Sequence, residues 1–404
     1  MTILKQPTLH KKREHKILGI KKIGNTFRFT FVTKLLMNFQ EIFDSYTWTE
    51  VSTAIQNKTT DDVETALQNA GNATLQDFMA LISPAAKPYL NEMALLSNQL
   101  TKKRFGNTIQ MYAPVYLSNE CQNICTYCGF SFDNKVTRLT LSEKQMHQEF
   151  EAIKTLGFDH VLIVTGEANQ TVNIEYFIKA IKIAKQYFAN ISIEVQPLEQ
   201  EEYEQLHQAD VYAVLVYQET YHKANYKNYH PKGKKSNFDY RLETPDRIGK
   251  AGIHKIGLGI LLGLEDWRTD SFFTALHLNY LEKKYWQTKY SISFPRIRPN
   301  ESCFQPNVVM DEKDLAQLIC AYRIFNENIE LSLSTRESIK FRDNAFKIGI
   351  TTMSAGSKTE PGGYAINSEA LEQFVIDDSR TPQQVERMIK QGGYEVIWKD
   401  WFQN

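Results

Sequence analysis

Long apolar runs are missing from this 404-residue sequence. No stretch approaches the ~18 uninterrupted apolar residues of a membrane-spanning helix, so no membrane association is expected. An excess of one charge is missing as well, because 47 Lys and Arg residues balance 47 Asp and Glu residues. A sequence-wide attraction to nucleic acid is therefore not expected. The 42% hydrophobic and 23% charged residues that are present are typical of a soluble globular protein.

Cysteine is scarce and unevenly placed. The chain has five cysteines, and three of them, Cys121, Cys125 and Cys128, fall within eight residues; the others are Cys303 and Cys320. An odd, clustered set argues against a disulfide framework. It favours a protein of the reducing cytoplasm that carries a metal site.

Acidic residues are nearly absent from the first 36 residues, which contain seven Lys and two Arg but only Glu14 as an acid. The segment FRFTFVTKLL is too short and too charged for a secretory signal. The composition superficially resembles a transit peptide. We favour a basic N-terminal extension over residues 1–37 that is not needed for function, with the functional chain starting at Met37.

Periodicity divides the remaining chain into three regions. Residues 38–110 are predicted to be helical, because apolar residues recur there at helical spacing. In residues 111–357, short apolar runs alternate with amphipathic helical segments, which is the pattern of βαβ units and a parallel sheet. Residues 358–404 contain a turn-rich loop, a short helix at 381–393 and a tail.

Eight strands are expected in the central region, without the strict alternation of a half-exposed sheet. Eight strands in roughly 250 residues is the size of a (β/α)₈ TIM-type barrel. A doubly wound open sheet is the alternative, but its Gly-rich nucleotide fingerprint is missing. The predicted strands are 111–118, 160–167, 191–198, 211–220, 255–264, 290–298, 329–336 and 349–356. The predicted helices between them are 141–157, 173–188, 241–252, 271–286 and 310–328.

Polar residues gather where the predicted strands end. Active sites of such barrels lie at the carboxyl ends of the strands, so we expect these residues to converge on one face. The three-cysteine cluster directly follows the first strand. The polar residues at the later strands are Thr165, Gly166, Glu167, Glu194, Gln196, Gln218, Glu219, Thr220, Ser334, Thr335, Arg336 and Ser354.

The cysteines form the motif Cys121-Gln-Asn-Ile-Cys125-Thr-Tyr-Cys128. Thiolates suit iron–sulfur clusters and zinc. A structural zinc site needs four ligands, whereas only three are local and no His lies inside the motif. Three thiolates fit a [4Fe–4S] cluster that leaves one iron open for a small chelating ligand. Zinc, or three ordinary buried cysteines, is the alternative.

The CxxxCxxC spacing with an aromatic residue before the last Cys resembles the signature of the radical S-adenosylmethionine (SAM) superfamily. The resemblance implies that the open iron chelates SAM and that one electron cleaves SAM to methionine and a 5′-deoxyadenosyl radical. It also implies that Tyr127 packs beside the adenine. Thr165-Gly166-Glu167 would hold the SAM amino group, with Thr where Gly is usual.

Two further positions suit ligand binding. Glu194 interrupts an apolar strand and is predicted to bind the ribose hydroxyls of SAM, or else to pair with a basic residue inside the barrel. Arg336, with Ser334, is predicted to bind the carboxylate of an amino-acid substrate through two hydrogen bonds. A structural ion pair of Arg336 with Glu337 or with an acid at the barrel rim is the alternative.

Several other residues are less informative. Arg296 and Arg298 compete with Arg336 for the carboxylate, and His222 fits a pocket or a loop equally well. Cys303 and Cys320 lack a CxxC partner and are interpreted as structural. The basic run KGKK (232–235) is interpreted as a solvated loop that could also meet an acidic partner.

Longer segments resemble the 2-iminoacetate synthases, the tyrosine lyases of bacterial thiazole (thiamine) biosynthesis, over about residues 38–402. The resemblance implies a barrel in which L-tyrosine binds beside SAM. The radical removes a hydrogen atom from the tyrosine amino group, and the Cα–Cβ bond breaks to give p-cresol and 2-iminoacetate (dehydroglycine). A thiazole synthase and an electron donor such as flavodoxin or ferredoxin are the implied protein partners. The segments are VYLSNECQNICTYCGF, YQETYH, HPKGKKSNFDYRLETPDRIGKAGI, IGLGILLGL, SISFPRIRP, ELSLSTRES, SAGSKTEPGGYA and VIWKDW.

Radical chemistry needs a dry site, and we expect the N-terminal helices and the 358–365 loop to cap the barrel. Three alternative functions are open. The tyrosine lyase of hydrogenase maturation carries a later cysteine set, but this chain has no Cys after Cys320. The tyrosine-using enzyme of deazaflavin synthesis should lack the VIWKDW tail. A non-catalytic iron–sulfur protein would not need the open iron or the polar strand ends.

Overall fold

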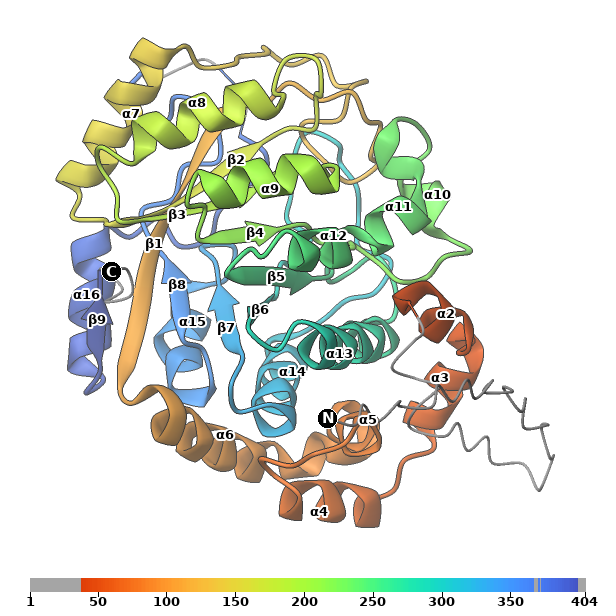
Figure 1. Cartoon of the computed structure of the whole chain (residues 1–404). Helices are drawn as coiled ribbons and strands as arrows, with labels where there is room; N and C mark the ends of the chain where they lie inside the picture. The colour runs from red at the N-terminus through yellow and green to blue at the C-terminus, as the bar shows by residue number, and fades with distance from the viewer. Residues whose placement is uncertain (1–37, 367–369, 371, 399–404) are drawn as a thin grey trace, which may run out of the picture. The chain divides into compact units, whose positions relative to one another are not determined.

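A computed structural model describes residues 38–366, 370 and 372–398 (Figure 1). The predicted basic extension, residues 1–37, lies outside the described residues, as do residues 399–404 with the end of the VIWKDW segment. Within the described part of the chain, no helix is both long and apolar enough to span a bilayer.

The core of the described unit is a closed barrel of eight parallel strands. Each strand pairs with the next one along the chain, and β1 pairs with β2 on one side and β8 on the other, which closes the sheet. The strands are β1 (Thr108–Ser118), β2 (His160–Thr165), β3 (Asn190–Glu194), β4 (Ala213–Leu215), β5 (Lys255–Gly259), β6 (Lys289–Ser293), β7 (Glu330–Leu333) and β8 (Thr352–Ser354). All eight predicted strands and the predicted barrel are thereby confirmed.

One short strand was not predicted. The strand β9 (Glu395–Ile397) pairs in parallel with the beginning of β1, where Thr108 lies opposite Glu395. Three residues are too few to show a periodicity, so the sequence offered no signal for this pairing.

Helices form the outer layer of the barrel (Figure 1). The predicted helices are confirmed, except that 241–252 is divided in two, because a new helix begins at Thr244, with Pro245 in its first turn. The short helices α9, α10 and α15 were not predicted. The helices are α7 (Glu143–Thr155), α8 (Ile174–Ala184), α9 (Gln200–Gln208), α10 (Tyr226–Tyr229), η2 (Lys234–Ser236), α11 (Phe238–Leu242), α12 (Thr244–Lys250), α13 (Trp267–Lys284), α14 (Glu312–Phe325), α15 (Ile339–Ala345), η3 (Phe346–Ile348) and α16 (Pro382–Gln391).

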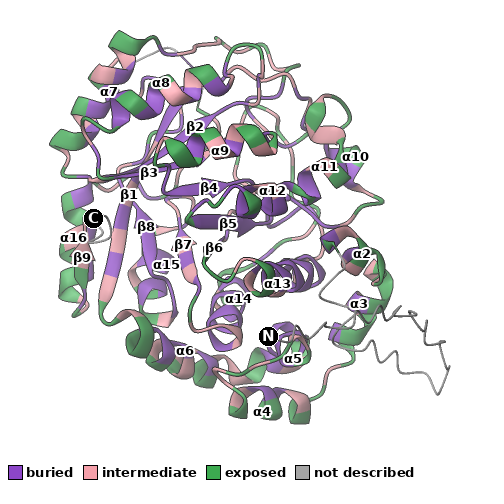
Figure 2. Cartoon of the chain, in the orientation of Figure 1, coloured by how far each residue is buried: buried purple, intermediate pink, exposed green. Residues whose placement is uncertain are grey.

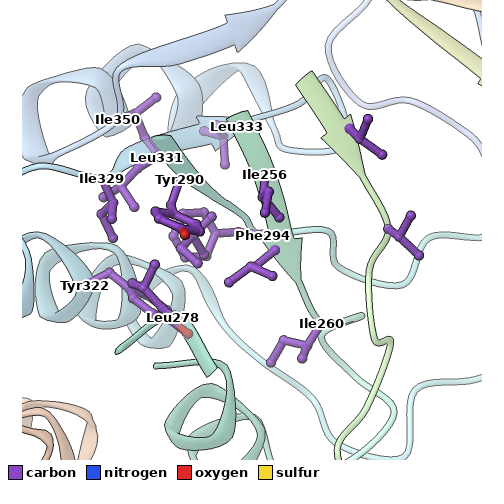
Figure 3. Packing of buried hydrophobic residues seen from close by; sticks show 14 of the residues in the cluster. Ile256, Ile260, Leu278, Tyr290, Phe294, Tyr322, Ile329, Leu331, Leu333 and Ile350 are labelled. Carbon is purple, nitrogen blue, oxygen red and sulfur yellow. The ribbon is translucent and has the colours of Figure 1, made fainter. Parts of the chain in front are cut away.

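Most residues of the barrel strands are buried, whereas the helices expose one face to solvent (Figure 2). Every residue of β2 is buried, which explains why its sequence HVLIVT shows no alternation. Figure 3 shows the apolar layer between the strands and helices, where Ile256 of β5 and Leu278 of α13 lie in one buried cluster. Phe294, just after β6, packs on Tyr322 of α14 with ring centroids 5.8 Å apart.

The N-terminal helices lie on the outside of this layer. They are α2 (Phe39–Asp44), α3 (Trp48–Gln56), α4 (Thr60–Gln68), α5 (Leu75–Ile82), η1 (Pro84–Tyr89) and α6 (Leu90–Phe105). The helices α3 and α5 pack on α13, and α5 and α6 pack on α14. Trp48 of α3 stacks on His222, in the segment after β4, with ring centroids 4.3 Å apart. A cap over the barrel mouth by these helices stays a prediction.

The C-terminal segment is tied to the carboxyl end of β7. The backbone amides of Asp377 and Asp378 both donate to the carbonyl of Thr335. The carboxylate of Asp378, fully buried, accepts from Arg342 at 2.5 Å and from Arg380 at 2.7 Å. The buried Arg342 guanidinium also donates to the carbonyl of Ser354 at the end of β8.

We predict that Asp378→Ala destabilises the fold by about 3–5 kcal/mol, because it leaves the Arg342 charge buried without its partner. The free energy of unfolding in urea measures this change. Asp343→Ala is the matched control, since Asp343 pairs with Arg380 but is 37% exposed; a loss of at most about 1 kcal/mol is expected there. Equal losses in the two variants would contradict the structural role given to the buried pair.

Candidate active site

Three adjoining cavities open at the carboxyl ends of the barrel strands. They share Glu194 from β3, Tyr217 from the segment after β4, and Gln373 from the C-terminal segment. One cavity extends to the cysteine motif and another to the end of β7. The predicted convergence of strand-end residues on one face is therefore seen for most of them.

All three motif cysteines line the same cavity. Their loop follows β1 and is held from both sides: the Ser131 hydroxyl accepts the Cys125 amide at 3.0 Å, and Arg138 donates to the carbonyls of Phe130 and Ser131. Such hydrogen bonds fix the backbone of the loop, so the three sulfur atoms keep facing the same cavity.

The kind of donor atom bears on the kind of metal centre. The three motif cysteines line the cavity together, and the two acids beside them, Glu167 and Glu219, are paired with Arg241 and Lys235. A structural zinc site takes four ligands. Cysteine thiolates are the ligands of iron–sulfur clusters. The chemistry of this donor set therefore fits an iron–sulfur cluster.

Burial raises the pKa of all three motif thiols, that of Cys121 to about 11. Protons therefore occupy the sulfurs at neutral pH unless a cation replaces them. Metal binding releases such protons, because only the thiolate is a ligand.

Tyr127 is buried beside the cysteines. Its hydroxyl lies 2.7 Å from His230 Nε2, and its backbone carbonyl accepts from Asn300 at 2.9 Å. The side chain lines the cavity that also contains Cys128. Tyr127 is thus positioned by two segments far apart in the sequence and presents a ring to the cavity.

The segment after β2 brings Thr165, Gly166 and Glu167 to the cysteine cavity. The Thr165 hydroxyl is buried and finds no hydrogen-bond partner among the described residues. A Cβ on Gly166 would lie 2.1 Å from the carbonyl oxygen of Glu120, so glycine is required there. The close approach that Gly166 permits is therefore one of the cysteine loop itself, and not only of a ligand.

Glu167 is already engaged in hydrogen bonds. Its carboxylate accepts from Arg241 at 2.9 Å and from Asn123, inside the cysteine motif, at 2.7 Å. Burial alone would raise the pKa of Glu167, but Arg241 and Lys235 outweigh that effect and lower it. The carboxylate is therefore ionised and shared, rather than free for one ligand.

Two basic residues of this site escaped the sequence analysis. Lys235 was interpreted as part of a solvated loop, which is wrong: its side chain is 12% exposed and its Nζ lies 2.8 Å from Glu219 Oε1. Arg241 of α11 is buried against Glu167. Neither residue shows a periodicity or spacing that marks it, because both reach the cavity from irregular segments or very short helices.

Glu194, at the end of β3, faces all three cavities. No Arg or Lys of the described residues lies within ion-pair distance of its carboxylate, so the alternative of a structural ion pair is not seen. Burial, followed by the nearby charge of Glu219, raises the pKa of Glu194 to about 7. A proton donor or acceptor near neutrality therefore faces the cavity.

Arg336 and Ser334 line the cavity at the end of β7. Arg336 has no ion-pair partner among the described residues; its guanidinium lies 3.3 Å from the ring centroid of Phe374. Burial lowers the pKa of Arg336. The alternative pairing with Glu337 is not seen, because Glu337 pairs with Arg296 and Arg298.

Other predicted residues point elsewhere. Gln196 donates to the Val172 carbonyl, Thr220 bonds Asp270, and His222 Nδ1 lies 3.0 Å from Glu265; none of these lines the cavities. Cys303 is exposed in a loop, and Cys320 is buried in α14.

The C-terminal segment supplies residues that the sequence analysis missed. Gln373 accepts from the Tyr116 hydroxyl at 2.8 Å, and Phe374 covers Arg336. Ser357 and Thr359 line the same cavity, so the predicted cap by the 358–365 loop is seen in part. The sequence offered no signal for these residues, because Tyr116 and Gln373 are 257 residues apart and meet only in the folded chain.

The arrangement suits zwitterionic ligands. Both acids and bases line these cavities: Glu167, Glu219, Glu194, Lys235, Arg241 and Arg336. A ligand with an ammonium and a carboxylate finds a complementary group for each. The enclosure by barrel and C-terminal segment limits the access of water.

Two models of protein families match the chain. The radical SAM superfamily matches residues 115–274, and the Biotin and Thiamin Synthesis associated domain matches residues 293–395. The 2-iminoacetate synthases of Escherichia coli (strain K12) and Salmonella typhimurium (strain LT2) are each 48% identical over 367 residues, which is 91% of this chain and 97% of theirs. A crystal structure of HydG, a maturase of the [FeFe]-hydrogenase, is similar with a TM-score of 0.83 and 30% identity, over 89% of this chain and 80% of that one.

We predict that Glu194 makes stability depend on pH. Between pH 4.5 and about 7 the folded protein holds a proton on Glu194 that the unfolded chain has lost, so stability falls as pH rises through this range. Relative to Glu194→Gln, the wild type should lose up to about 3 kcal/mol of unfolding free energy. Urea unfolding of cluster-free protein at pH 5 and pH 8 measures it. Glu301→Gln, in an exposed loop, should show no such difference; an equal shift there would contradict the assignment.

Proposed function

The chain belongs to the 2-iminoacetate synthase family of radical SAM enzymes, and from that premise we propose that it cleaves L-tyrosine between Cα and Cβ. The products are 2-iminoacetate and p-cresol, with SAM converted to 5′-deoxyadenosine and methionine. 2-Iminoacetate then serves the thiazole moiety of thiamine. One observation carries the substrate assignment: Arg336 lies half-buried at the cavity wall with no carboxylate partner among the described residues.

Cys121, Cys125 and Cys128 would hold a [4Fe–4S] cluster, in keeping with their shared cavity. When bound there, the cluster would supply the single electron for the reductive cleavage of SAM. The cysteine loop contributes a rigid mount, since Ser131 and Arg138 bind its backbone.

The chain's residues position SAM through its charged and polar groups. The ion pairs of Glu167 with Arg241 and of Glu219 with Lys235 line the cavity, so they present both charges to the ammonium and the carboxylate of SAM while they stay paired with each other. Thr165 offers a hydroxyl that has no partner within the described part of the chain, and Tyr127 offers a ring for the adenine. Glu194 suits the ribose hydroxyls, in its ionised or its protonated form, because its pKa lies near 7.

Arg336 orients L-tyrosine by binding its carboxylate, with the Ser334 hydroxyl in the same wall. The tyrosine carboxylate would supply the countercharge that the half-buried Arg336 guanidinium lacks, and this ion pair would stabilise the bound substrate. Fixing the carboxylate sets the amino group of tyrosine relative to SAM, which is what selective hydrogen removal requires. Phe374 and Pro295 keep water from this end of the cavity.

Two protein partners belong to this proposal. A thiazole synthase would receive the 2-iminoacetate, because an imine hydrolyses in water and gains from direct transfer. An electron donor such as flavodoxin or ferredoxin would reduce the cluster. The HydG likeness offers hydrogenase-maturation chemistry as a second candidate, but identity to the 2-iminoacetate synthases is higher, at 48% against 30%.

Anaerobic assay with reconstituted cluster, SAM, dithionite and L-tyrosine should yield p-cresol and 5′-deoxyadenosine. Cys125→Ala should abolish both products, because one iron loses its ligand. Cys303→Ser is the matched control and should retain both, since Cys303 lies exposed in a loop. Deoxyadenosine without p-cresol would contradict the lyase activity, and the absence of both would contradict radical SAM chemistry altogether.

Arg336→Lys should raise KM for tyrosine by about tenfold or more, because lysine cannot form the two-point contact with a carboxylate. Steady-state p-cresol formation measures it, and Kd for SAM should change by less than about twofold. Arg298→Lys is the control, as Arg298 is already paired with Asp377 at 2.9 Å. A larger rise in KM for Arg298→Lys would transfer the carboxylate role to that residue.

A further inference from the structure

The outer side of the cysteine loop carries a large exposed aromatic residue. Phe132 follows the motif by four residues, and 60% of its surface is exposed. Its backbone amide donates to the carbonyl of Asn123, between the first two cysteines, at 2.9 Å. The ring is thus anchored to the loop that holds the sulfurs and still faces solvent.

A second loop lies against the same cysteine motif. The amide of Ile124 donates to the carbonyl of Lys232 at 3.0 Å, and that of Thr126 donates to the carbonyl of Tyr229. Gly233 has a φ of 95°, and a Cβ there would lie 2.2 Å from Asn123 Oδ1. Only glycine permits this contact, so the loop 229–235 is held tightly to the motif.

Four lysines on or beside these two loops are exposed: Lys135, Lys232 and Lys234 on the loops, and Lys227 in the adjoining helix α10. No carboxylate of the described residues lies within ion-pair distance of any of them, in contrast to the neighbouring Lys223, which pairs with Asp239 at 2.7 Å. Asp133 is the exposed acid within the same stretch of residues 130–135. In a chain of zero net charge, this is a local concentration of positive charge.

Lys235 differs from the other two lysines of the KGKK run in where its side chain lies. It turns inward to Glu219 in the cavity, whereas Lys232 and Lys234 of the same KGKK run are exposed. One short loop therefore gives charge to the ligand cavity on one side and to the solvent on the other.

We propose that this electron-donor surface, formed by Phe132, Lys135, Lys227, Lys232 and Lys234, docks an acidic protein that delivers single electrons to the cluster. The inference rests on the proposed function, because it requires a cluster on the three cysteines. In the step, the donor is oxidised by one electron and the cluster is reduced by one; no proton or chemical group is transferred.

Three properties of the surface favour this partner. Electron tunnelling weakens steeply with distance, and this surface lies on the loop that carries the sulfurs. Unpaired lysines attract an acidic partner and raise its rate of association, most strongly at low salt. Electron-transfer complexes are small and transient, so one aromatic residue within a basic ring is enough contact.

The first test measures binding of the donor protein alone, without electron transfer or turnover. Flavodoxin, a small acidic flavoprotein, serves as the probe against the full-length protein at low salt. Lys232→Glu combined with Lys234→Glu should weaken its Kd by at least about tenfold and flatten the salt dependence. The control combines Lys182→Glu and Lys250→Glu, which change the net charge equally. Both are exposed near the ends of α8 and α12 that lead into β3 and β5, at the opposite end of the barrel.

Turnover with two reductants separates this inference from the proposed function. With flavodoxin as donor, the Lys232→Glu, Lys234→Glu variant should form deoxyadenosine at least about tenfold more slowly than the control. With dithionite, which needs no docking, the two should agree within about twofold. A failure with dithionite in the wild type rejects the proposed function. Normal dithionite turnover with unchanged flavodoxin binding, or equal weakening in the control, rejects the docking surface alone.

A variant at the aromatic centre adds a charge-neutral check. Phe132→Gln keeps the backbone bond to Asn123 and removes the apolar contact. It should weaken flavodoxin binding by about threefold or more without altering its salt slope. Unchanged binding would exclude Phe132 from the interface and overturn the surface as defined.

Discussion

A buried set of opposite charges beneath the cysteine loop holds the candidate site together. Glu167 after β2 bonds Arg241 of α11 and Asn123 of the motif, while Glu219 after β4 bonds Lys235. Burying any one of these charges alone would be costly, so each fixes the position of the next. The cysteine motif, two strand ends and two short helices are thereby locked in one arrangement, with their remaining polar atoms facing the cavity.

Closure of the barrel brings the segments that carry these charges to the same end of the molecule. Because β1 pairs with both β2 and β8, the loop after β1 meets segments from the far end of the chain, as Tyr116 meets Gln373. Two charged groups in the resulting cavity, Glu194 and Arg336, lack an ion-pair partner among the described residues. Unpaired buried charge is unfavourable in the empty protein, and bound ligands that supply the countercharge turn it into binding energy.

Much of the framework followed from local patterns. Eight apolar runs became the eight barrel strands, and the helical periodicity placed the helices between them, apart from α9, α10 and α15. The spacing of Cys121, Cys125 and Cys128 indicated a metal centre, and their position after the first strand put it at the barrel mouth. Arg336 and Glu194 stood out in the sequence because a charged residue in or beside an apolar strand is costly to bury unless it is paired or binds a ligand. The roles of all these residues stay predictions.

The sequence by itself determined the fold, the family and the cysteine motif. Hydrophobic periodicity and motif spacing depend on residues that are near one another in the chain, and resemblance to a family is seen by comparing sequences directly. The tertiary structure alone decided which charges meet. Lys235 looked like its neighbours Lys232 and Lys234, yet it turns into the cavity, and Gln373 sits in a segment without regular structure. Side chains on irregular loops are directed by contacts with distant segments, such as Gly233 against Asn123, and no local pattern records such contacts.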